Sequence, residues 1–347
     1  MTTFKGNFGD YKIISILGEC SEGKAAVHLA KHIPSSTMVA LKRFYMDKMT
    51  NAEQTYSVEL EIATAKQLQH PNILQYHTNF VHGFDVYVVS PLMAYCSCRD
   101  LLNQHFNNGL PQQAILIILR DLLCALAYMH RNGYIHRAIK ASHVLVSETG
   151  KSCLTGFKYS CLRVLKGKWQ NNVHSFLSDP KPVLNWTSPE LLEQNLQGYN
   201  DQSDMYSVGM FICELANGSE PFLGMACTLM LTEKLRGCVP QLLDCTTVPR
   251  QTEGDCVISP IIVNRRFSKD LHEVTGLCLS RNPNHRPKAG KLLNHSLFKS
   301  IKKRTLSLNE LLKPALPLSD KVAFNREDVE NLDVNHFSNL ALCTWDF

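Results

Sequence analysis

Short runs of apolar residues alternate with turn-forming residues over the first ninety positions of the chain. Gly18, Gly23 and Pro34 separate the first three runs, which is typical of strands joined by turns. Ala52–Gln69 is predicted to be a helix that ends before Pro71, because proline disfavours helical geometry in the residue preceding it. Five runs are predicted to be strands: Tyr11–Leu17, Ala25–Lys31, Met38–Phe44, Ile73–Phe80 and Val86–Ser90.

From Cys98 onward, apolar positions recur at intervals of three and four residues, which predicts helices. The clearest of these helices are Ala114–Arg131, Ser203–Ala216, Thr228–Arg236 and Ser268–Ser280. The most apolar stretch, Ala114–Met129, is interrupted by Arg120 and Asp121, so we interpret it as a core helix and not a membrane span. A β-rich region followed by a helical one predicts an α+β fold with a small β-rich N-terminal lobe and a larger helical C-terminal lobe.

Composition narrows the class of protein. The 347 residues are 44% hydrophobic and 19% charged, which is ordinary for a globular protein. The 36 basic and 31 acidic residues leave a net charge of +5, too small and too scattered to indicate a nucleic-acid partner. The 13 cysteines include no Cys-x-x-Cys pair, which favours buried thiols over disulfides or a metal site. With no signal segment at the N-terminus, we expect a cytoplasmic or nuclear protein without a membrane partner.

Two segments do not read as regular structure. Residues 244–266 contain Pro249, Gly254 and Pro260 and are predicted to be an irregular surface insert. Residues 299–347 are predicted to be a tail, which ends in Trp345, Asp346 and Phe347. Large aromatic side chains at the exposed end of a polar tail are frequent binding hot spots.

A lysine and a glutamate stand at a suggestive spacing in the β-rich region. Lys42 closes the run Val39-Ala40-Leu41-Lys42, and Glu61 follows nineteen residues later on the predicted helix. An unpaired buried charge is costly, so we expect these two side chains to pair. The preceding segment from Gly18 to Gly23 is either a hairpin turn or a phosphate-binding loop. Cys20 places a side chain where close approach to a phosphate favours glycine.

Three short motifs resemble the catalytic segments of eukaryotic protein kinases. They are His136-Arg137-Ala138, His143 and Gly156-Phe157-Lys158. In kinases the corresponding Asp orients the attacking hydroxyl, and the corresponding Asn and second Asp hold Mg²⁺. Ala138, His143 and Gly156 replace these three residues here, so the resemblance implies no catalytic residue and no metal site.

Framework positions of the same family are also present, and they are expected to be structural. Ser188-Pro189-Glu190 and Arg286 match a buried ion pair, and Asp204 matches the aspartate that holds the catalytic-loop backbone. His136 and Phe157 match side chains of the kinase core. The resemblance implies an N-terminal arm at 1–10, a kinase-like domain at 11–298 and the tail at 299–347. The lobes would be about 11–92 and 93–298.

The resemblance also implies a nucleotide site. Its expected residues are Leu17, Gly18, Gly23, Val27, Ala40, Lys42, Glu61, Met93 and Leu145. Lys140 stands where kinases contact the γ-phosphate, and it is either a phosphate ligand or a solvated lysine.

A narrower resemblance points to the STRAD pseudokinase adaptors. It rests on five segments: the run from His136 to His143, Met93-Ala94-Tyr95, the run from Glu193 to Tyr199, the run from Cys213 to Gly218, and the terminal Trp345-Asp346-Phe347. Members of this family bind a liver tumour-suppressor serine/threonine kinase as a pseudosubstrate and stabilise its active state. The resemblance therefore implies an adaptor without catalysis, with the C-terminal tripeptide docked on a helical-repeat scaffold protein. It also implies ATP bound without a metal.

Two alternatives stay open at this point. One is a weakly active or atypical serine/threonine kinase, which would need a substitute for the general base missing at Ala138. The other is a diverged pseudokinase with a different partner. Asp346 replaces the family's glutamate, the insert is shorter than the family's, and Lys42 keeps the ordinary kinase lysine where the best-known member has an arginine nearby.

Overall fold

The computed structural model describes residues 3–20, 22–194, 196–248, 259–299, 307–315 and 317–318. These residues pack as two compact units. The first contains the described residues up to 101, those of 142–160, and those of 313–318. The second contains 102–141 and the described residues of 161–312. The lobe boundary expected near residue 92 is a single division of the sequence, whereas each of these units is a group of separate segments that pack together. The expected boundary therefore stays a prediction.

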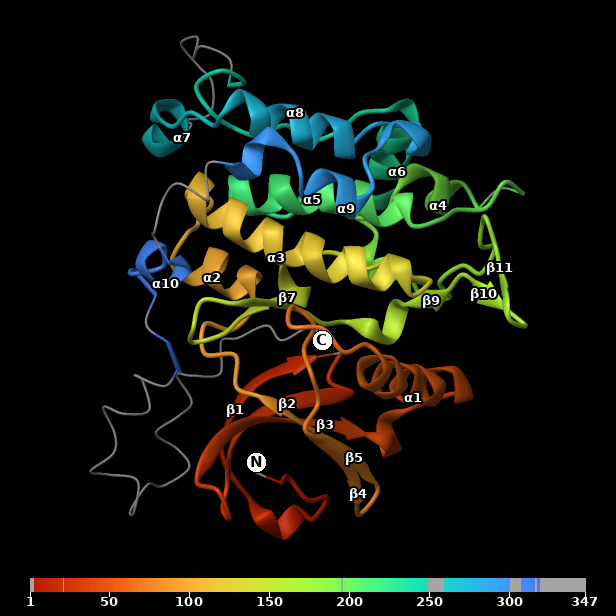
Figure 1. The fold of residues 1–347 in the computed structure, drawn as a ribbon, viewed down its shortest axis with the longest axis vertical. Coiled ribbons are helices and arrows are strands. Elements are labelled where there is room, and N and C mark those ends of the chain that lie inside the picture. Colours follow the sequence, from red (N-terminus) through yellow and green to blue (C-terminus); the bar gives the residue numbers. More distant parts are fainter. Residues whose placement is uncertain are drawn as a thin grey trace. The chain divides into compact units, whose positions relative to one another are not determined.

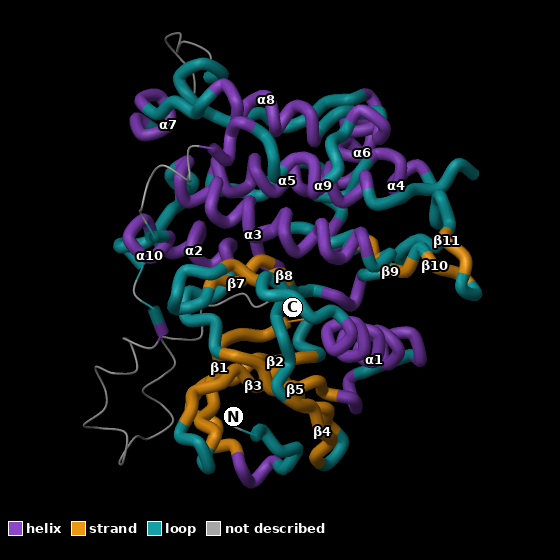
Figure 2. Tube along the Cα trace, viewed as in Figure 1, coloured by secondary structure: helices purple, strands orange, loops and turns teal. Residues whose placement is uncertain are grey.

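The first unit is built on a five-stranded antiparallel sheet with the strand order β1-β2-β3-β5-β4 (Figures 1 and 2). Its strands are β1 Tyr11–Cys20, β2 Ala25–His32, β3 Thr37–Tyr45, β4 Thr78–His82 and β5 Asp85–Pro91, with a hairpin of β7 Val144–Val146 and β8 Ser152–Leu154. Its helical segments are α1 Ala52–Gln67 and the 3-10 turns η1 Phe8–Asp10, η2 Met46–Lys48 and η4 Phe157–Tyr159.

Alternate residues of the central strands enter two apolar clusters, as the twofold repeat of a strand requires. Leu29 on β2 and Ala40 on β3 belong to one cluster, while their neighbours Ala30 and Leu41 belong to the other. The side chain of Asn51 accepts a hydrogen bond from Gln54 N and so caps the first turn of α1. The predicted α+β class is thereby confirmed for the β-rich part.

One predicted strand was wrong over half its length. Ile73–Phe80 was expected to be continuous, but β4 begins only at Thr78. The chain before it pairs elsewhere: Ile73 forms an isolated bridge with Leu154, and Leu74 N donates to Leu154 O at 2.9 Å. Apolar periodicity identified a buried segment correctly and could not reveal which backbone it would pair with.

The second unit is mainly helical. Its helices are α3 Gln112–Arg131, α4 Pro189–Glu193, α5 Gln202–Asn217, α6 Cys227–Arg236, α7 Pro260–Asn264, α8 Lys269–Cys278, α9 Ala289–Leu292 and α10 Leu308–Leu311. Its short strands are β6 Tyr134–Ile135, β9 Cys161–Leu162, β10 Val164–Leu165 and β11 Lys168–Trp169, and its 3-10 turns are η5 Lys181–Val183, η6 Pro283–His285 and η7 Ser296–Lys299. Two elements, α2 Cys98–Gln104 and η3 Ala141–His143, contain the residues at which the chain passes between units. The four helices predicted from periodicity are confirmed to within two residues at each end.

Helix α5 forms the centre of the second unit and packs against α3 and α8 (Figure 1). Every residue of α5 from Gln202 to Ala216 is buried. Gly109 comes so close to this helix that a Cβ atom there would lie 1.9 Å from Ala216 O, which explains the glycine.

Among the described helices, α3 is long and apolar enough by composition to cross a membrane, and 61% of its most apolar 18-residue stretch is buried. This burial is what the interpretation as a core helix requires.

Hydrogen bonds hold both described ends of the insert expected at 244–266 against the rest of the second unit. Asp244 is fully buried and accepts hydrogen bonds from Phe267 N and His272 Nε2, each at 2.9 Å. Cys245 N donates to Arg265 O at 3.0 Å. The expectation of an irregular surface segment therefore missed the short helix α7 and this buried carboxylate, while residues 249–258 lie outside the described part.

Candidate functional site

Lys42 and Glu61 form a buried ion pair within the first unit. The Lys42 Nζ and Glu61 Oε1 atoms are 2.7 Å apart, and the two residues are 5% and 1% exposed. Strand β3 carries the lysine and helix α1 carries the glutamate. Tyr76 Oη donates to the same glutamate oxygen at 3.1 Å, and burial, followed by the Glu61 charge, raises the pKa of this phenol well above its ordinary value. Sequence reasoning missed the tyrosine, because nothing in its spacing links it to Glu61.

The apolar residues expected to hold a nucleotide belong to one cluster. Leu17, Val27, Ala40, Met93 and Leu145 are all at most 3% exposed and are members of the larger apolar cluster of the first unit. They come from strands β1, β2, β3 and β7 and from the segment after β5, so the fold gathers positions spread over almost 130 residues.

The glycine-containing loop lies between β1 and β2. Gly18 pairs with Val27 across the two strands, and Glu22 and Gly23 both have positive φ, at 56° and 77°. Such a conformation suits Gly23 and makes a tight turn. Cys20 is 3% exposed and packs into the apolar cluster, while Ser21 lies outside the described residues. The structure thus shows a turn that suits Gly23, and a role of this loop in binding phosphate stays a prediction.

A tail residue joins this cluster, and sequence reasoning missed it. Leu318 is 3% exposed, and its backbone N–H donates to Ala94 O at 2.8 Å. Ala94 follows Met93, one of the expected nucleotide residues. No motif marks Leu318, because it lies in a segment whose sequence predicts only a proline-containing tail.

His143 and Gly156 lie against each other in the first unit. Gly156 has φ of +87°, and a Cβ atom placed there would be 2.6 Å from His143 Nδ1. His143 is 1% exposed, and Thr155 N donates to its carbonyl oxygen at 3.0 Å. The imidazole therefore fills the space that any side chain at position 156 would need. Two of the three replaced motif positions are thus sterically coupled.

Ala138, the third replaced position, lies in the second unit. It is 1% exposed, and its N–H donates to His136 Nδ1 at 3.2 Å. Lys140, two residues later, is 5% exposed and donates to Pro182 O at 3.3 Å. The alternative of a solvated surface lysine is therefore wrong for Lys140.

Asp204 anchors the backbone of this loop. Its carboxylate accepts from His136 N at 2.9 Å, from Arg137 N at 2.8 Å and from His130 Nε2 at 2.8 Å. Burial alone would raise the pKa of Asp204, but the hydrogen bond and charge of His130, with the contacts from His136, hold that pKa below its ordinary value. An ionised carboxylate at the start of α5 thus fixes the conformation of the loop that contains Ala138.

Glu190 and Arg286 form a two-pronged ion pair in the second unit. Arg286 Nη1 and Nη2 lie 2.6 and 2.9 Å from the two Glu190 oxygens. Arg286 also donates to Ser280 O, Gln202 O and Arg281 O, so its guanidinium joins α4, α5 and the turn before η6. Arginine suits such a site because its planar fork matches a carboxylate and still has donors left for carbonyl groups.

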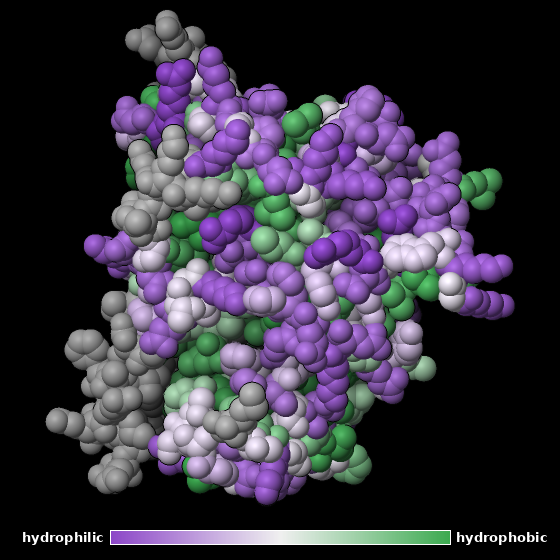
Figure 3. All heavy atoms as spheres, viewed as in Figure 1, coloured by the Kyte–Doolittle hydropathy of each residue, from purple (hydrophilic) through white to green (hydrophobic). Residues whose placement is uncertain are grey.

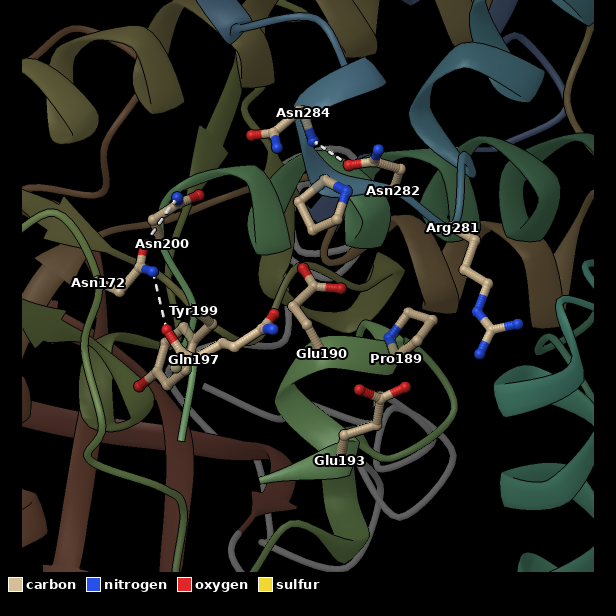
Figure 4. Close-up of a pocket in the computed structure, with 12 residues that line it drawn as sticks. Asn172, Pro189, Glu190, Glu193, Gln197, Tyr199, Asn200, Arg281, Asn282 and Asn284 are labelled. Carbon is tan, nitrogen blue, oxygen red and sulfur yellow. Dashed lines mark hydrogen bonds between the residues drawn. The ribbon is translucent and has the colours of Figure 1, made fainter. Parts of the chain in front are cut away.

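A polar cavity of about 560 Å³ opens beside this pair (Figure 4). Glu190 and Glu193 line it from α4, and Asn282 and Asn284 line it from η6 and the turn before it. On another side, Asn172 donates to Gln197 O at 2.8 Å and accepts from Asn200 Nδ2 at 3.1 Å. The amides of this wall are therefore largely occupied by bonds within the unit.

A second, apolar cavity of about 150 Å³ lies between α4, α6 and the chain leading to them. Leu191 and Leu192 of α4, Leu231 of α6 and Leu184 contribute to its lining, together with Phe176. It contrasts with the largely polar surface that covers the visible helices of the second unit (Figure 3). The lining residues at positions 176–187 lie in the sequence between Gly156-Phe157-Lys158 and Ser188-Pro189-Glu190, whereas Leu191, Leu192 and Gln194 follow that second motif and Leu231 belongs to α6. The expected docking residues Trp345, Asp346 and Phe347 lie outside the described part of the chain.

Comparison with known proteins agrees with these features. A family model described as protein kinase domain matches residues 11–298. STE20-related kinase adapter protein alpha of Mus musculus is 38% identical over 376 residues, covering 100% of this chain and 86% of the mouse protein. The Bos taurus protein of the same name is also 38% identical, with both chains covered completely. STE20-related kinase adapter protein beta of Homo sapiens is 35% identical, covering 89% of this chain and 80% of the human protein.

Proposed function

Because the chain belongs to the STE20-related kinase adapter family within the protein kinase fold, we propose that it is a catalytically inactive adaptor for a partner kinase. The partner is a serine/threonine kinase, the liver tumour-suppressor kinase that the STRAD resemblance implies. The adaptor binds it in a pseudosubstrate-like manner and shifts it toward its active state. A helical-repeat scaffold protein completes the assembly.

The observation that carries this proposal is the contact between His143 and Gly156. Both positions belong to the metal-binding motifs of a kinase, and here an imidazole occupies the space that a carboxylate at 156 would need. Losing metal anchors and the general base together removes the groups that stabilise phosphoryl transfer. The ion pairs and apolar core remain, and a binding protein needs both.

The direct test is reconstitution with the purified partner kinase. We expect its activity toward a peptide substrate to rise when this chain and the scaffold protein are added, and this chain alone to transfer no phosphate from ATP with Mg²⁺. Phosphate transfer by this chain in the absence of the partner would favour the alternative of an atypical kinase. An unchanged partner, with binding to a different kinase in a pull-down, would favour the diverged pseudokinase.

We further propose that the first unit binds ATP without Mg²⁺. Lys42 would contact the phosphates, and the apolar cluster around Leu17, Ala40 and Leu145 would take the adenine ring. A ligand that binds the folded state stabilises it by about 2.7 kcal/mol at a hundredfold excess over Kd. We therefore expect millimolar ATP to raise the melting temperature equally with Mg²⁺ and with EDTA. No shift in either condition would contradict nucleotide binding.

The scaffold contact is assigned to the C-terminal tripeptide. Trp345 and Phe347 are large apolar side chains in a polar tail, which supports a docking role. Deleting residues 345–347 should abolish binding to the scaffold protein while leaving the melting temperature unchanged. Retained binding would place the contact elsewhere.

For localisation we propose the cytoplasm and the nucleus, with the short basic run Lys302-Lys303-Arg304 as a weak import signal.

A further inference from the structure

Lys234 is a lysine at an inward-facing position of a helix. It lies four residues after Met230 on α6, and the two residues are 0% and 1% exposed. Residues four apart share one face of a helix, so Lys234 stands where an apolar residue is expected. Taking an ammonium group out of water is costly unless hydrogen bonds replace its hydration.

Three main-chain carbonyl groups supply that replacement. Lys234 Nζ donates to Leu184 O at 3.0 Å, to Asn185 O at 2.7 Å and to Thr187 O at 2.8 Å. Burial lowers the pKa of Lys234 to about 7, and in the ammonium form its three N–H donors each have one carbonyl acceptor. The rings of Tyr206 and Phe222 lie 5.8 and 5.6 Å from the same nitrogen, within reach of cation–π attraction.

The remaining carbonyl of the same stretch is also bonded from the helical core. Ser207 Oγ on α5 donates to Trp186 O at 2.9 Å. The Trp186 indole N–H donates to Glu214 Oε2 at 2.7 Å, and that oxygen also accepts from Ala141 N at 2.9 Å. All four carbonyl groups from Leu184 to Thr187 therefore point into the second unit and are held by side chains of α5 and α6.

This stretch forms one wall of the apolar cavity. Leu184 and Thr187 line it together with Leu231, which lies three residues before Lys234 on the same helix. In many kinases the corresponding part of the chain becomes ordered only when phosphorylation creates new arginine contacts. Here the buried contacts are supplied by residues of the chain itself.

We propose that Lys234 is the positioning residue that fixes residues 184–187 as a preformed surface for the partner kinase, without phosphorylation. The docking half of this statement rests on the adaptor function proposed above. The positioning half concerns the free protein and can be tested alone.

Hydrogen–deuterium exchange of the full chain tests the positioning half. The N–H groups of Trp186 and Thr187 both donate to Val183 O, so they report on this stretch. In Lys234→Met we expect them to exchange at least about tenfold faster, because three carbonyl groups lose a charged donor. Arg236→Met is the matched control on the same helix, since its side chain is 69% exposed, and it should leave these amides unchanged. Unchanged exchange in Lys234→Met would overturn the proposal.

Two further variants separate positioning from charge and from global unfolding. Lys234→Arg keeps the charge, but its planar fork does not place three donors around one point, so we expect it to lose protection too. Full protection in that variant would overturn a three-point positioning role. If Lys234→Met unfolds the chain, Ser207→Ala is measured instead, because it removes one uncharged hydrogen bond, the one from Ser207 Oγ to Trp186 O. We expect the same amides to exchange about threefold faster in that variant, and unchanged exchange would count against the network.

Binding to immobilised liver tumour-suppressor kinase tests the docking half. We expect Lys234→Met to raise Kd at least about tenfold and Arg236→Met to stay within about twofold of the wild type. Lost protection with unchanged Kd would overturn the docking half. If the wild-type chain does not bind this kinase, the proposed function fails while the exchange experiment still decides the role of Lys234.

Discussion

The contact between His143 and Gly156 and the anchors formed by Asp204, Glu190 and Arg286 belong to the same set of kinase motifs. In the first region an imidazole packs against a glycine, at positions where a kinase places oxygen atoms for metal ions. In the second, carboxylates remain, and each is bonded to main-chain N–H groups or to a guanidinium. On the proposed function, carboxylates that bond to the protein are present and those that would bond to metal are replaced. Folding and chemistry would then depend on different members of one motif set.

The largest effect is expected in the second region, for Arg286→Met. Removing the buried arginine leaves the partly exposed Glu190 carboxylate and the carbonyl groups of Ser280, Gln202 and Arg281 without their charged donor, so the free energy of unfolding should fall by about 3–5 kcal/mol. Urea denaturation measures this change. Arg281→Met, at an exposed position next to the same cavity, serves as the control and should change it by less than about 0.5 kcal/mol. Equal effects of the two substitutions would remove the distinction between the regions.

A smaller loss is expected for Asp204→Asn, which keeps the shape and removes the charge. Hydrogen bonds to a charged group contribute more than neutral ones, and we expect a loss of about 2–3 kcal/mol at pH 7. The pKa of Asp204 is lowered in the folded state, so this stabilisation is present above about pH 4 and is lost as the pH falls below it. Melting temperatures from pH 7 to pH 3 should therefore converge for wild type and variant. A constant gap over this range would contradict an ionised Asp204.

In the first region, Gly156→Asp would restore the kinase residue at a cost in stability. A non-glycine residue at positive φ costs about 1–2 kcal/mol, and the contact with His143 adds to that. Gly83→Asp is a matched control, because Gly83 has φ of +61° and a Cβ atom added there would meet no heavy atom within 4 Å. We expect Gly156→Asp to destabilise the chain by about 1 kcal/mol more than Gly83→Asp. Adding His143→Ala should remove this excess, and its persistence would show that His143 is not the cause.

The smallest effect is expected for Ala138→Asp. This substitution supplies a carboxylate for the attacking hydroxyl and leaves positions 143 and 156 without metal ligands. We expect no phosphate transfer from radiolabelled ATP to a generic protein substrate. A gain on the order of 10²-fold over the wild type would mean that the first region still supports catalysis.

Spacing in the sequence was sufficient to predict a contact or an element where the residues lie on one element or on two that follow each other along the chain. The nineteen-residue interval between Lys42 and Glu61 placed them on a strand and the following helix, and the structure has them 2.7 Å apart. Helical periodicity located α3, α5, α6 and α8 because each buries one face or more.

Contacts between distant backbone segments could not be predicted in this way. Ile73 and Leu74 look like part of a strand, but they bond to Leu154, eighty residues later. Periodicity places Lys234 on a helix, but a single sequence does not reveal that its inward face meets three carbonyl groups. For Lys140 the sequence allows a phosphate ligand or a solvated side chain, and the structure buries it against Pro182 O.

The position of Leu318 changes what counts as the smallest foldable piece of this protein. The protein kinase family model ends at residue 298, yet Leu318 is 3% exposed in the first unit and bonded to Ala94 O. A fragment cut at the end of the family match would leave that carbonyl and part of the apolar cluster exposed to water. Burying one leucine side chain is worth about 1.5–3 kcal/mol, which is a large share of the stability of a typical domain. A protein expressed only to residue 298, where the family match ends, is therefore expected to be less stable than the chain that includes Leu318.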